Sequence, residues 1–364
     1  MKATLGRHNN RAPGFDTVRL VAASAVALHH SLGLDIDIVR DDVIYKFSGH
    51  YTHLGLLAVA VFFAISGFLV TPGLAKDGDV PNYLSRRFMR IIPLLCTVVL
   101  ATALVFGPLM TTWTARAYFS DPLTWRYLVN VTTFLSLQLP GVTGRLGSDV
   151  VNGPLWTLHY EWICYFIVAF ASVAGALRRR YIFLLLWLAV VIVMWAGFRD
   201  ATVEEMNSRA FTLAYLFAYF GAGMLMFLFS DALRWSPWLL LAAAIALLAA
   251  WGMGLGYLLA PFLTAYIAVG LGLVRFPWSA ALSKVDLSYG VYLTHSLVLT
   301  IVVRVLEVKS GLVLFAIGLP VSFMVALATW TLIEKPALRH KHLPAQLWRG
   351  LIGRFSAVGG ITAQ

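Results

Sequence analysis

Two side chains that could do acid–base chemistry lie on one face of the first apolar segment. Arg19 and His30 are eleven positions apart, and eleven steps of about 100° return almost to the same side of a helix, about 16 Å along its axis. A histidine can take a proton from a hydroxyl group, and a guanidinium can stabilise negative charge. Asp16, one turn before Arg19, is close enough to pair with it. A structural ion pair with an interfacial histidine is the alternative interpretation.

A carboxylate is expected at a similar depth in the segment that begins near residue 154. Thr157, Glu161 and Tyr165 recur every four residues after Trp156, so they form a polar stripe along one helical face. Glu161 would lie about 10 Å below the membrane surface, close to the depth of His30. The two groups could act as a general acid–base pair. A structural hydrogen bond from Glu161 to another helix remains the alternative.

Three arginines, Arg86, Arg87 and Arg90, precede the apolar run at 91–110. Spacings of three and four residues place Arg90 beside each of the other two at the start of a helix. Guanidinium groups suit phosphate recognition because each offers a planar fork of donors. Simple anchoring at the cytoplasmic membrane surface is the alternative.

Polar residues also lie in the last two apolar segments. Ser288, Tyr292 and His295 share a face at helical spacing, although a lone histidine in a helix is more often a satisfied core residue. Glu334 follows the final apolar run. It could pair with one of the three arginines across the bundle, or it could be an ordinary charge at the rim.

The framework that must position these side chains is a membrane one. Of 364 residues, 60% are hydrophobic and 12% are charged, with a mean hydropathy of +0.79. Soluble domains carry about 25% charged residues, so too few charges remain to cover a soluble surface. The net charge of +11 falls in short loops, which favours membrane orientation over nucleic-acid binding.

Ten apolar segments are each close to the roughly 20 residues that a helix needs to cross a bilayer. They span residues 15–34, 54–75, 88–110, 154–177, 181–198, 210–230, 236–254, 257–275, 286–306 and 311–333. The sequence therefore predicts an all-α, polytopic membrane helix bundle with about ten transmembrane helices. A buried charge costs about 2.5–3.5 kcal/mol at a helix centre, so the charges within these segments need partners or a water-filled cavity.

The distribution of Lys and Arg predicts the orientation. Loops on the same side as the N-terminus carry about twice as many of them as the opposite loops. Both termini are therefore expected in the cytoplasm, with a tail at 1–14, the membrane domain at 15–335 and a tail at 336–364. The charges in the first apolar segment, and the lack of a small-residue cleavage site after it, argue against a cleavable signal peptide.

The two cysteines, Cys96 and Cys164, both lie in apolar segments. They indicate neither a disulfide framework nor a metal cluster. We expect them to fill space in the core, and we expect no metal.

Six motifs occur in one order: Arg19-x10-His30, SGF at 66–68, RRxxRxxP at 86–93, WTLxxE at 156–161, SYGVYLTH at 288–295 and EKP at 334–336. With these motifs, the chain resembles the acyltransferase-3 family over about residues 14–340. That family comprises membrane O-acyltransferases of bacterial polysaccharides, nodulation factors and macrolides.

The resemblance implies roles for particular residues. Arg19 and His30 match the family's essential Arg-x10-His pair, and Glu161 matches its acidic residue after the tryptophan. The family's cytoplasmic arginines, matched by Arg86, Arg87 and Arg90, are proposed to hold the phosphates of coenzyme A. His295 stands at its C-terminal histidine.

The sequence departs from the family pattern at two places. Ala58-Val59-Ala60 replaces the frequent Gly-Val-Asp, and Ser296 and Leu297 replace a proline that often follows His295. The first departure removes an acidic side chain, and the second leaves the role of His295 open.

We therefore expect an integral membrane O-acyltransferase in a bacterial inner membrane. It would move an acyl group, with acetyl favoured, from cytoplasmic acyl-CoA to a hydroxyl of a cell-envelope or exported carbohydrate. His30 would act as the base, in preference to carrying the acyl group itself. The rival interpretation is a multi-span transporter or flippase whose buried charges line a substrate path. The sequence shows no inverted repeat of spans that would favour it.

Overall fold

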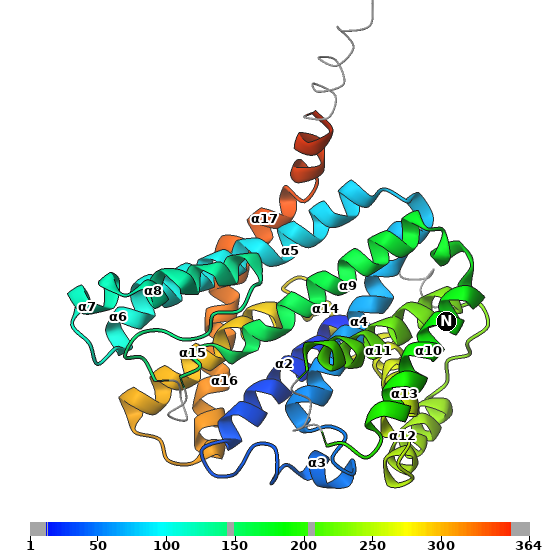
Figure 1. Ribbon diagram of the computed structural model, residues 1–364, viewed down its shortest axis with the longest axis horizontal. Coiled ribbons are helices and arrows are strands. Elements are labelled where there is room, and N and C mark those ends of the chain that lie inside the picture. Colours follow the sequence, from blue (N-terminus) through cyan, green and yellow to red (C-terminus); the bar gives the residue numbers. More distant parts are fainter. Residues whose placement is uncertain (1–11, 13, 144–148, 203–207, 351–364) are drawn as a thin grey trace, which may run out of the picture.

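The computed structural model describes residues 12, 14–143, 149–202 and 208–350. Within these ranges the chain folds into helices and contains no strand (Figure 1). The all-α fold class is therefore confirmed. Nearly all of the predicted N-terminal tail, and residues 351–364 of the predicted C-terminal tail, lie outside the described residues.

Each of the ten predicted segments overlaps one long helix, and α5 begins eight residues before the predicted start at 88. These helices are α2 (Phe15–Leu32), α4 (Leu54–Asp77), α5 (Val80–Ala101), α9 (Trp156–Val173), α10 (Arg180–Phe198), α11 (Arg209–Leu228), α12 (Pro237–Gly252), α13 (Gly256–Gly272), α15 (Ser288–Leu306) and α16 (Gly311–Thr329). By length and composition, six helices of the described residues could cross a membrane. They include α4, α10, α11 and α15, together with two continuous runs that begin with α5 and α16. The total of ten spans and the orientation stay predictions.

Shorter elements connect or extend these helices. They are α3 (Val43–Phe47), η1 (Thr102–Phe106), α6 (Gly107–Met110), α7 (Ala115–Ser120), α8 (Pro122–Arg126), η2 (Tyr127–Thr132), η3 (Gly153–Leu155), η4 (Ala176–Arg178), α14 (Ser279–Leu282), η6 (Trp330–Glu334) and α17 (Lys335–Arg339). Both η1 and η6 are π-helical turns that continue the preceding long helix.

A tight turn brings the arginine-bearing helix directly after α4. Gly78 ends α4 with φ +63°, a left-handed conformation that glycine adopts without strain. Asp79 then caps α5 by accepting a hydrogen bond from the backbone N–H of Asn82 at 3.1 Å. The arginines at 86–90 therefore lie in the first turns of α5, close to this end of α4.

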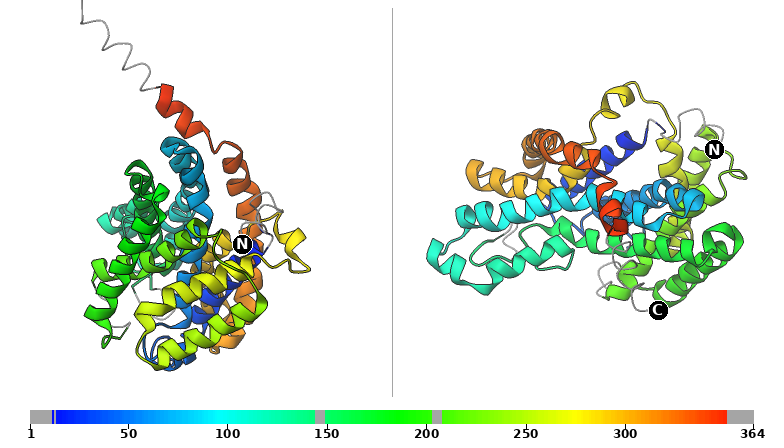
Figure 2. Two further views of the ribbon diagram at one scale, coloured as in Figure 1. Left: turned by 90° about the vertical axis from the view of Figure 1, so that its right-hand side faces the viewer. Right: turned by 90° about the horizontal axis from the view of Figure 1, so that it is seen from above.

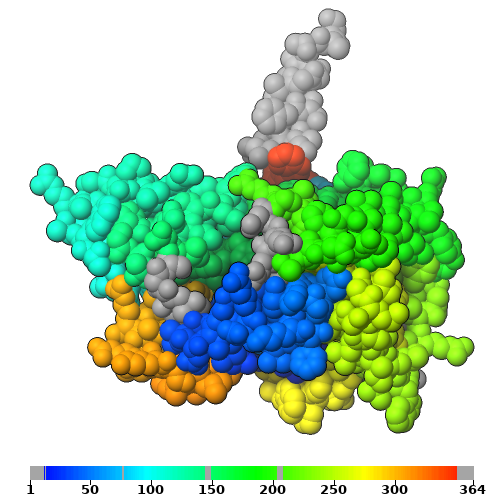
Figure 3. Space-filling model, turned by 60° about the horizontal axis from the view of Figure 1, so that its bottom comes forward, coloured from blue at the N-terminus to red at the C-terminus, as the bar shows by residue number. Residues whose placement is uncertain are grey.

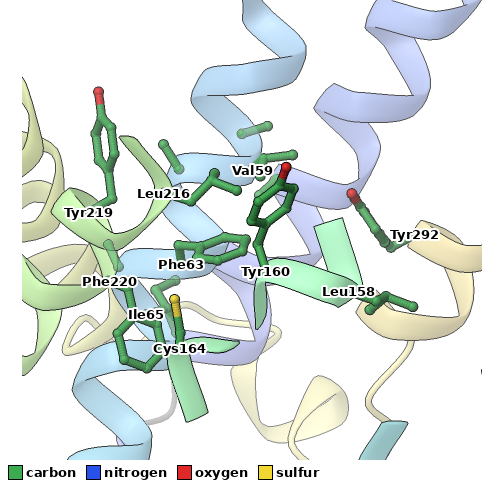
Figure 4. Packing of buried hydrophobic residues seen from close by; sticks show 14 of the residues in the cluster. Val59, Phe63, Ile65, Leu158, Tyr160, Cys164, Leu216, Tyr219, Phe220 and Tyr292 are labelled. Atoms are coloured by element: carbon green, nitrogen blue, oxygen red, sulfur yellow. The ribbon is translucent and has the colours of Figure 1, made fainter. Parts of the chain in front are cut away.

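Helix α4 lies at the centre of the bundle and packs against α2, α9, α11 and α13. Its contact with α11 is close because two glycines face the neighbouring backbone. A Cβ atom on Gly67 would overlap the carbonyl group of Phe220, and one on Gly223 would overlap that of Ala64. Small residues allow such an approach between helices in a membrane, where packing rather than water exclusion drives association. Figure 4 shows side chains of α4, α9 and α11 filling the space beside this contact.

Different helices begin and end at the two ends of the bundle. Helix α5 begins near one end, whereas α2 ends and α3 lies near the opposite end (Figure 1). Helix α15 packs against α2, α16, η3 and α5. Figure 3 views the α3 end, where the blue surface that includes α2, α3 and the start of α4 lies between α15–α16 and the yellow-green surface of α12–α13.

The described part of the predicted C-terminal tail packs on the beginning of α5. Residues 343–350 are helical and continue away from the main body of the molecule (Figure 2). The Ser85 hydroxyl donates to the carbonyl oxygen of Lys341 at 2.7 Å. Arg349 pairs with Asp79 at 2.5 Å. The C-terminal segment therefore attaches to the end of the bundle that carries the arginines.

Candidate active site

Two cavities inside the bundle contain most of the predicted site residues. The first, which we call the arginine chamber, has a volume of about 90 Å³ and is lined by Arg19, Arg87, Arg90, Glu161 and Tyr165, among others. The second, the histidine chamber, has a volume of about 120 Å³ and is lined by a different polar set: His29, His30, His53, Trp156 and Tyr292, among others. The side chains of Val59 and Tyr292 line both cavities, so the two chambers are neighbours.

An ion-pair network joins three helices beside the arginine chamber. The Asp286 carboxylate lies 3.0 Å from Arg19 and 2.5 Å from Arg90, and Arg90 lies 3.2 Å from Glu334. Ser288 donates its hydroxyl to Asp286 at 2.7 Å. These contacts connect α2, α5 and the start of α15 with η6. Buried charges in such a network must be paired because an isolated one is costly.

The network confirms one prediction and adds a carboxylate that the sequence did not point to. Arg19 pairs with Asp286, across the bundle, and the predicted pair of Asp16 and Arg19 stays a prediction. The expected ion pair between Glu334 and one of the three arginines is confirmed, with Arg90 as the partner. Asp286 was missed because an aspartate two residues before a helix is an ordinary capping residue. Its partners become visible only when the helices are assembled.

The three arginines of α5 have different surroundings. Arg90 is already neutralised by two carboxylates. Arg87 lines the arginine chamber, where its guanidinium carbon lies 5.9 Å from the centre of the Tyr165 ring. Within the described part of the chain, Arg87 forms no ion pair with a carboxylate. Arg86 does not line the chamber, and the three arginines as phosphate ligands stay a prediction.

The polar residues of the α9 stripe form hydrogen bonds within α9 and with α15. Tyr165 donates its hydroxyl to the Glu161 carboxylate, and Thr157 shares a 2.8 Å hydrogen bond with the hydroxyl of Tyr292. Glu161 lines the arginine chamber and His30 the histidine chamber. The predicted general acid–base pair of Glu161 and His30 stays a prediction, and His30 has another hydrogen-bond partner.

That partner is His295 on α15. The Nδ1 atom of His30 lies 2.8 Å from Nε2 of His295, and Nδ1 of His295 lies 3.0 Å from the carbonyl oxygen of Val291. A carbonyl oxygen only accepts, so Nδ1 of His295 carries a proton and its Nε2 accepts from His30. The neutral His30 ring then carries its lone pair on Nε2. His295 is fully buried and fixes this tautomer of His30.

A second pair of histidines lies in the same chamber, and the sequence analysis missed it. The rings of His29 and His53 stack with their centres 4.5 Å apart, and His29 Nδ1 lies 3.4 Å from the Asp42 carboxylate. Consecutive residues of a helix point about 100° apart. The adjacent His29 and His30 therefore indicated that His29 would face a different part of the bundle from His30. They did not indicate which distant side chain would meet His29.

The described residues contain no group of three or more His, Cys, Asp or Glu side chains that could hold a metal ion. Cys96 and Cys164 are not bonded to each other, and Cys164 is fully buried.

Comparison with known proteins gives a consistent assignment. A family profile described as an acyltransferase domain matches residues 13–331. An O-acetyl transferase from Shigella phage Sf6 is 28% identical, over 88% of this chain and 94% of that protein. Nodulation protein 10 from Rhizobium leguminosarum bv. viciae is 28% identical, over 92% of this chain and 94% of that protein. The exopolysaccharide production protein ExoZ of Rhizobium meliloti is 27% identical, over 84% of this chain and 96% of that protein. No solved structure matches the chain.

The match to the family profile begins just before α2 and ends within η6, so it includes both chambers and the helices that line them. The protein is an acyltransferase, and the chain belongs to the acyltransferase-3 family.

Proposed function

We propose that the protein is an integral membrane O-acyltransferase that moves an acetyl group from cytoplasmic acetyl-CoA to a hydroxyl of a cell-envelope or exported carbohydrate. The observation that carries the proposal is the His30–His295 hydrogen bond, which leaves a basic imidazole nitrogen in a chamber that adjoins a cluster of arginines. The names of the O-acetyl transferase and exopolysaccharide relatives support the acetyl group and the carbohydrate acceptor.

The arginine chamber suits the donor. Arg87 offers a guanidinium without a carboxylate partner among the described residues, which is what a phosphate group of coenzyme A requires. Arg19 pairs with Asp286 and lines the same chamber from α2. From there it can stabilise negative charge on the thioester carbonyl oxygen. The boundary formed by Val59 and Tyr292 is where the thioester would reach His30.

The transfer step is acid–base catalysis by His30. Its Nε2 atom takes the proton of the acceptor hydroxyl as the oxygen attacks the thioester carbonyl carbon. The C–O bond forms, the C–S bond breaks, and the protonated ring returns the proton to the departing sulfur, which leaves as the thiol of coenzyme A. His30 Nδ1–H donates a hydrogen bond to His295 Nε2 throughout the reaction. This bond stabilises the His30 ring while the ring is positively charged. Glu161 acts in the donor chamber, through Tyr165, rather than on His30.

The test measures release of coenzyme A thiol by detergent-solubilised membranes that contain the protein, acetyl-CoA and an envelope polysaccharide from cells that lack the gene. We expect release from the wild type and a loss of at least 10²-fold in His30→Ala. His340→Ala, which changes an exposed histidine remote from both chambers, is the matched control and should keep full activity. Unfolding temperatures of the variants report whether each has folded.

Two results would contradict the proposal. His30→Ala could keep wild-type thiol release while it remains folded, which would remove His30 from the reaction. The wild type could consume no thioester at all. That second result is what a transporter or flippase predicts, because transport leaves the donor intact.

A further inference from the structure

A carboxylate with no part in the transfer step described above lies behind His29, which lines the histidine chamber. Asp42, which is 8% exposed, accepts backbone hydrogen bonds from Tyr45 at 3.0 Å and from Leu54 at 3.1 Å. Its carboxylate also holds His29 Nδ1. Burial opposes the charge of Asp42, yet the His29 contact and the two N–H groups together lower its pKa below 3.8. A charged Asp42 therefore ties α3, the start of α4 and α2 together.

His53 is held in this group with one ring nitrogen already used. It caps α4, and its Nδ1 atom accepts the backbone N–H of Leu56 at 3.3 Å. The proton of the neutral ring must then be on Nε2, on the side away from the helix backbone. Burial and the neighbouring His29 lower the pKa of His53 to about 3, so the ring is neutral at physiological pH and remains a donor through Nε2.

The stack with His29 fixes the plane of the His53 ring. His29 can approach because Gly55 has no side chain: a Cβ atom there would overlap the His29 ring. His53 is only partly buried, and it lines the chamber together with His30 and Trp156. The chamber thus combines a basic nitrogen, an N–H donor and an aromatic face.

We propose that His53 is a binding residue for the acyl acceptor: its Nε2–H donates a hydrogen bond to an oxygen of the carbohydrate and holds the reacting hydroxyl beside His30. The proposal rests on the function proposed above and names a residue outside the six sequence motifs. Trp156 adds an aromatic surface against the apolar face of a sugar ring. A neutral donor suits this position because it does not compete with His30 for the acceptor's proton.

His53→Asn separates binding from folding. The asparagine side-chain oxygen can still accept the Leu56 N–H, since asparagine is among the best capping residues, but the ring N–H in the chamber is lost. We expect the KM for the envelope polysaccharide to rise at least 10-fold. The KM for acetyl-CoA, and the slow hydrolysis of acetyl-CoA measured without polysaccharide, should stay within 2-fold of the wild type.

His50→Asn is the matched control. His50 lies in the same segment, is exposed, and has φ +71°, a conformation that asparagine tolerates well. Both KM values should be unchanged. Gly55→Ala supplies a second variant, because its methyl group displaces the His29 ring and with it the stack. It should raise the KM for polysaccharide without a chemical change to His53.

Each outcome has a separate meaning. An unchanged KM for polysaccharide in folded His53→Asn would overturn the inference while the proposed function stands. A lower unfolding temperature with equal changes in both KM values would also overturn it, because it would show a cap with only a structural role. A wild type that releases no thiol would overturn the proposed function and this inference with it.

Discussion

Nδ1 of His30 and Nε2 of His295 lie 2.8 Å apart, although the two residues are separated by 265 positions in the sequence. Their rings are nearly parallel, with centres 5.1 Å apart. One histidine is only partly buried and lines the chamber, whereas the other is fully buried and bonded to the backbone. This difference is the reason why the proposed mechanism gives the proton transfer to His30 and the positioning to His295.

His295→Phe should keep the packing of the ring and remove the acceptor for His30. We expect kcat to fall on the order of 10²-fold, the scale of a lost acid–base contribution, while the KM for acetyl-CoA stays unchanged. Steady-state kinetics of thiol release measure both quantities. Ser296→Ala, on the next residue of α15, is the control. Equal losses in kcat and in acetyl-CoA binding would instead indicate a general disturbance of the bundle.

Arg87→Ala should weaken donor binding, because Arg87 lines the arginine chamber without a carboxylate partner among the described residues. A 10-fold rise in the KM for acetyl-CoA, or about 1.4 kcal/mol, is the expected scale. Arg86→Ala removes the same charge from the adjacent position outside the chamber and should change the KM less than 2-fold. Similar effects of the two changes would mean that the arginines act only as a diffuse positive surface.

Arg90→Met should mainly lower the unfolding temperature, with a smaller effect on the KM for acetyl-CoA. It leaves Glu334, which is 2% exposed, without its cation, and breaking a buried pair in this way costs about 3–5 kcal/mol. The unfolding temperature in detergent measures the loss. Adding Glu334→Gln should recover part of it, since the uncompensated charge is then removed.

The exposed pair of Arg180 and Asp231 supplies the comparison for Arg90. Their side chains are 33% and 45% exposed, and pairs of this kind contribute about 0–1 kcal/mol. Arg180→Ala should therefore leave the unfolding temperature almost unchanged. A larger effect from Arg180→Ala than from Arg90→Met would contradict the structural role assigned to the network around Asp286.

Gly223→Ala should lower the unfolding temperature, because the added methyl group would overlap the Ala64 carbonyl and push α4 away from α11. Gly197→Ala in α10 makes the same chemical change where a Cβ atom would meet nothing within 4 Å. That substitution should be neutral or stabilise by about 0.5–1 kcal/mol, since alanine favours helix more than glycine does. The opposite order of stabilities would exclude close α4–α11 packing.

The sequence predicted the helices well because hydrophobic runs and helical spacing are local properties. Each apolar segment overlaps one long helix, and the face shared by Arg19 and His30 follows from α2 alone. The SGF motif at 66–68 lies where Gly67 meets the backbone of α11. How many helices cross the membrane, and in which direction, remains a prediction.

The partners of the polar side chains could not be predicted in the same way. Spacing places His295 on a face of its helix, but it does not reveal that this face meets α2. The same holds for Asp286, which binds Arg19 and Arg90 only because three helices converge there. For Glu161, a similar estimated depth suggested contact with His30, yet depth fixes one coordinate and leaves the direction around the bundle undetermined.

The anchoring of the 33–53 segment has a consequence for how substrate preference can diversify. Asp42 fastens this stretch to α3, to the first residue of α4 and to α2, so its borders are fixed by one carboxylate. Residues between these attachment points can change without moving the long helices. Under the function proposed above, changes in this short loop would alter the preference for the acceptor and leave the arginine chamber at the far end unchanged.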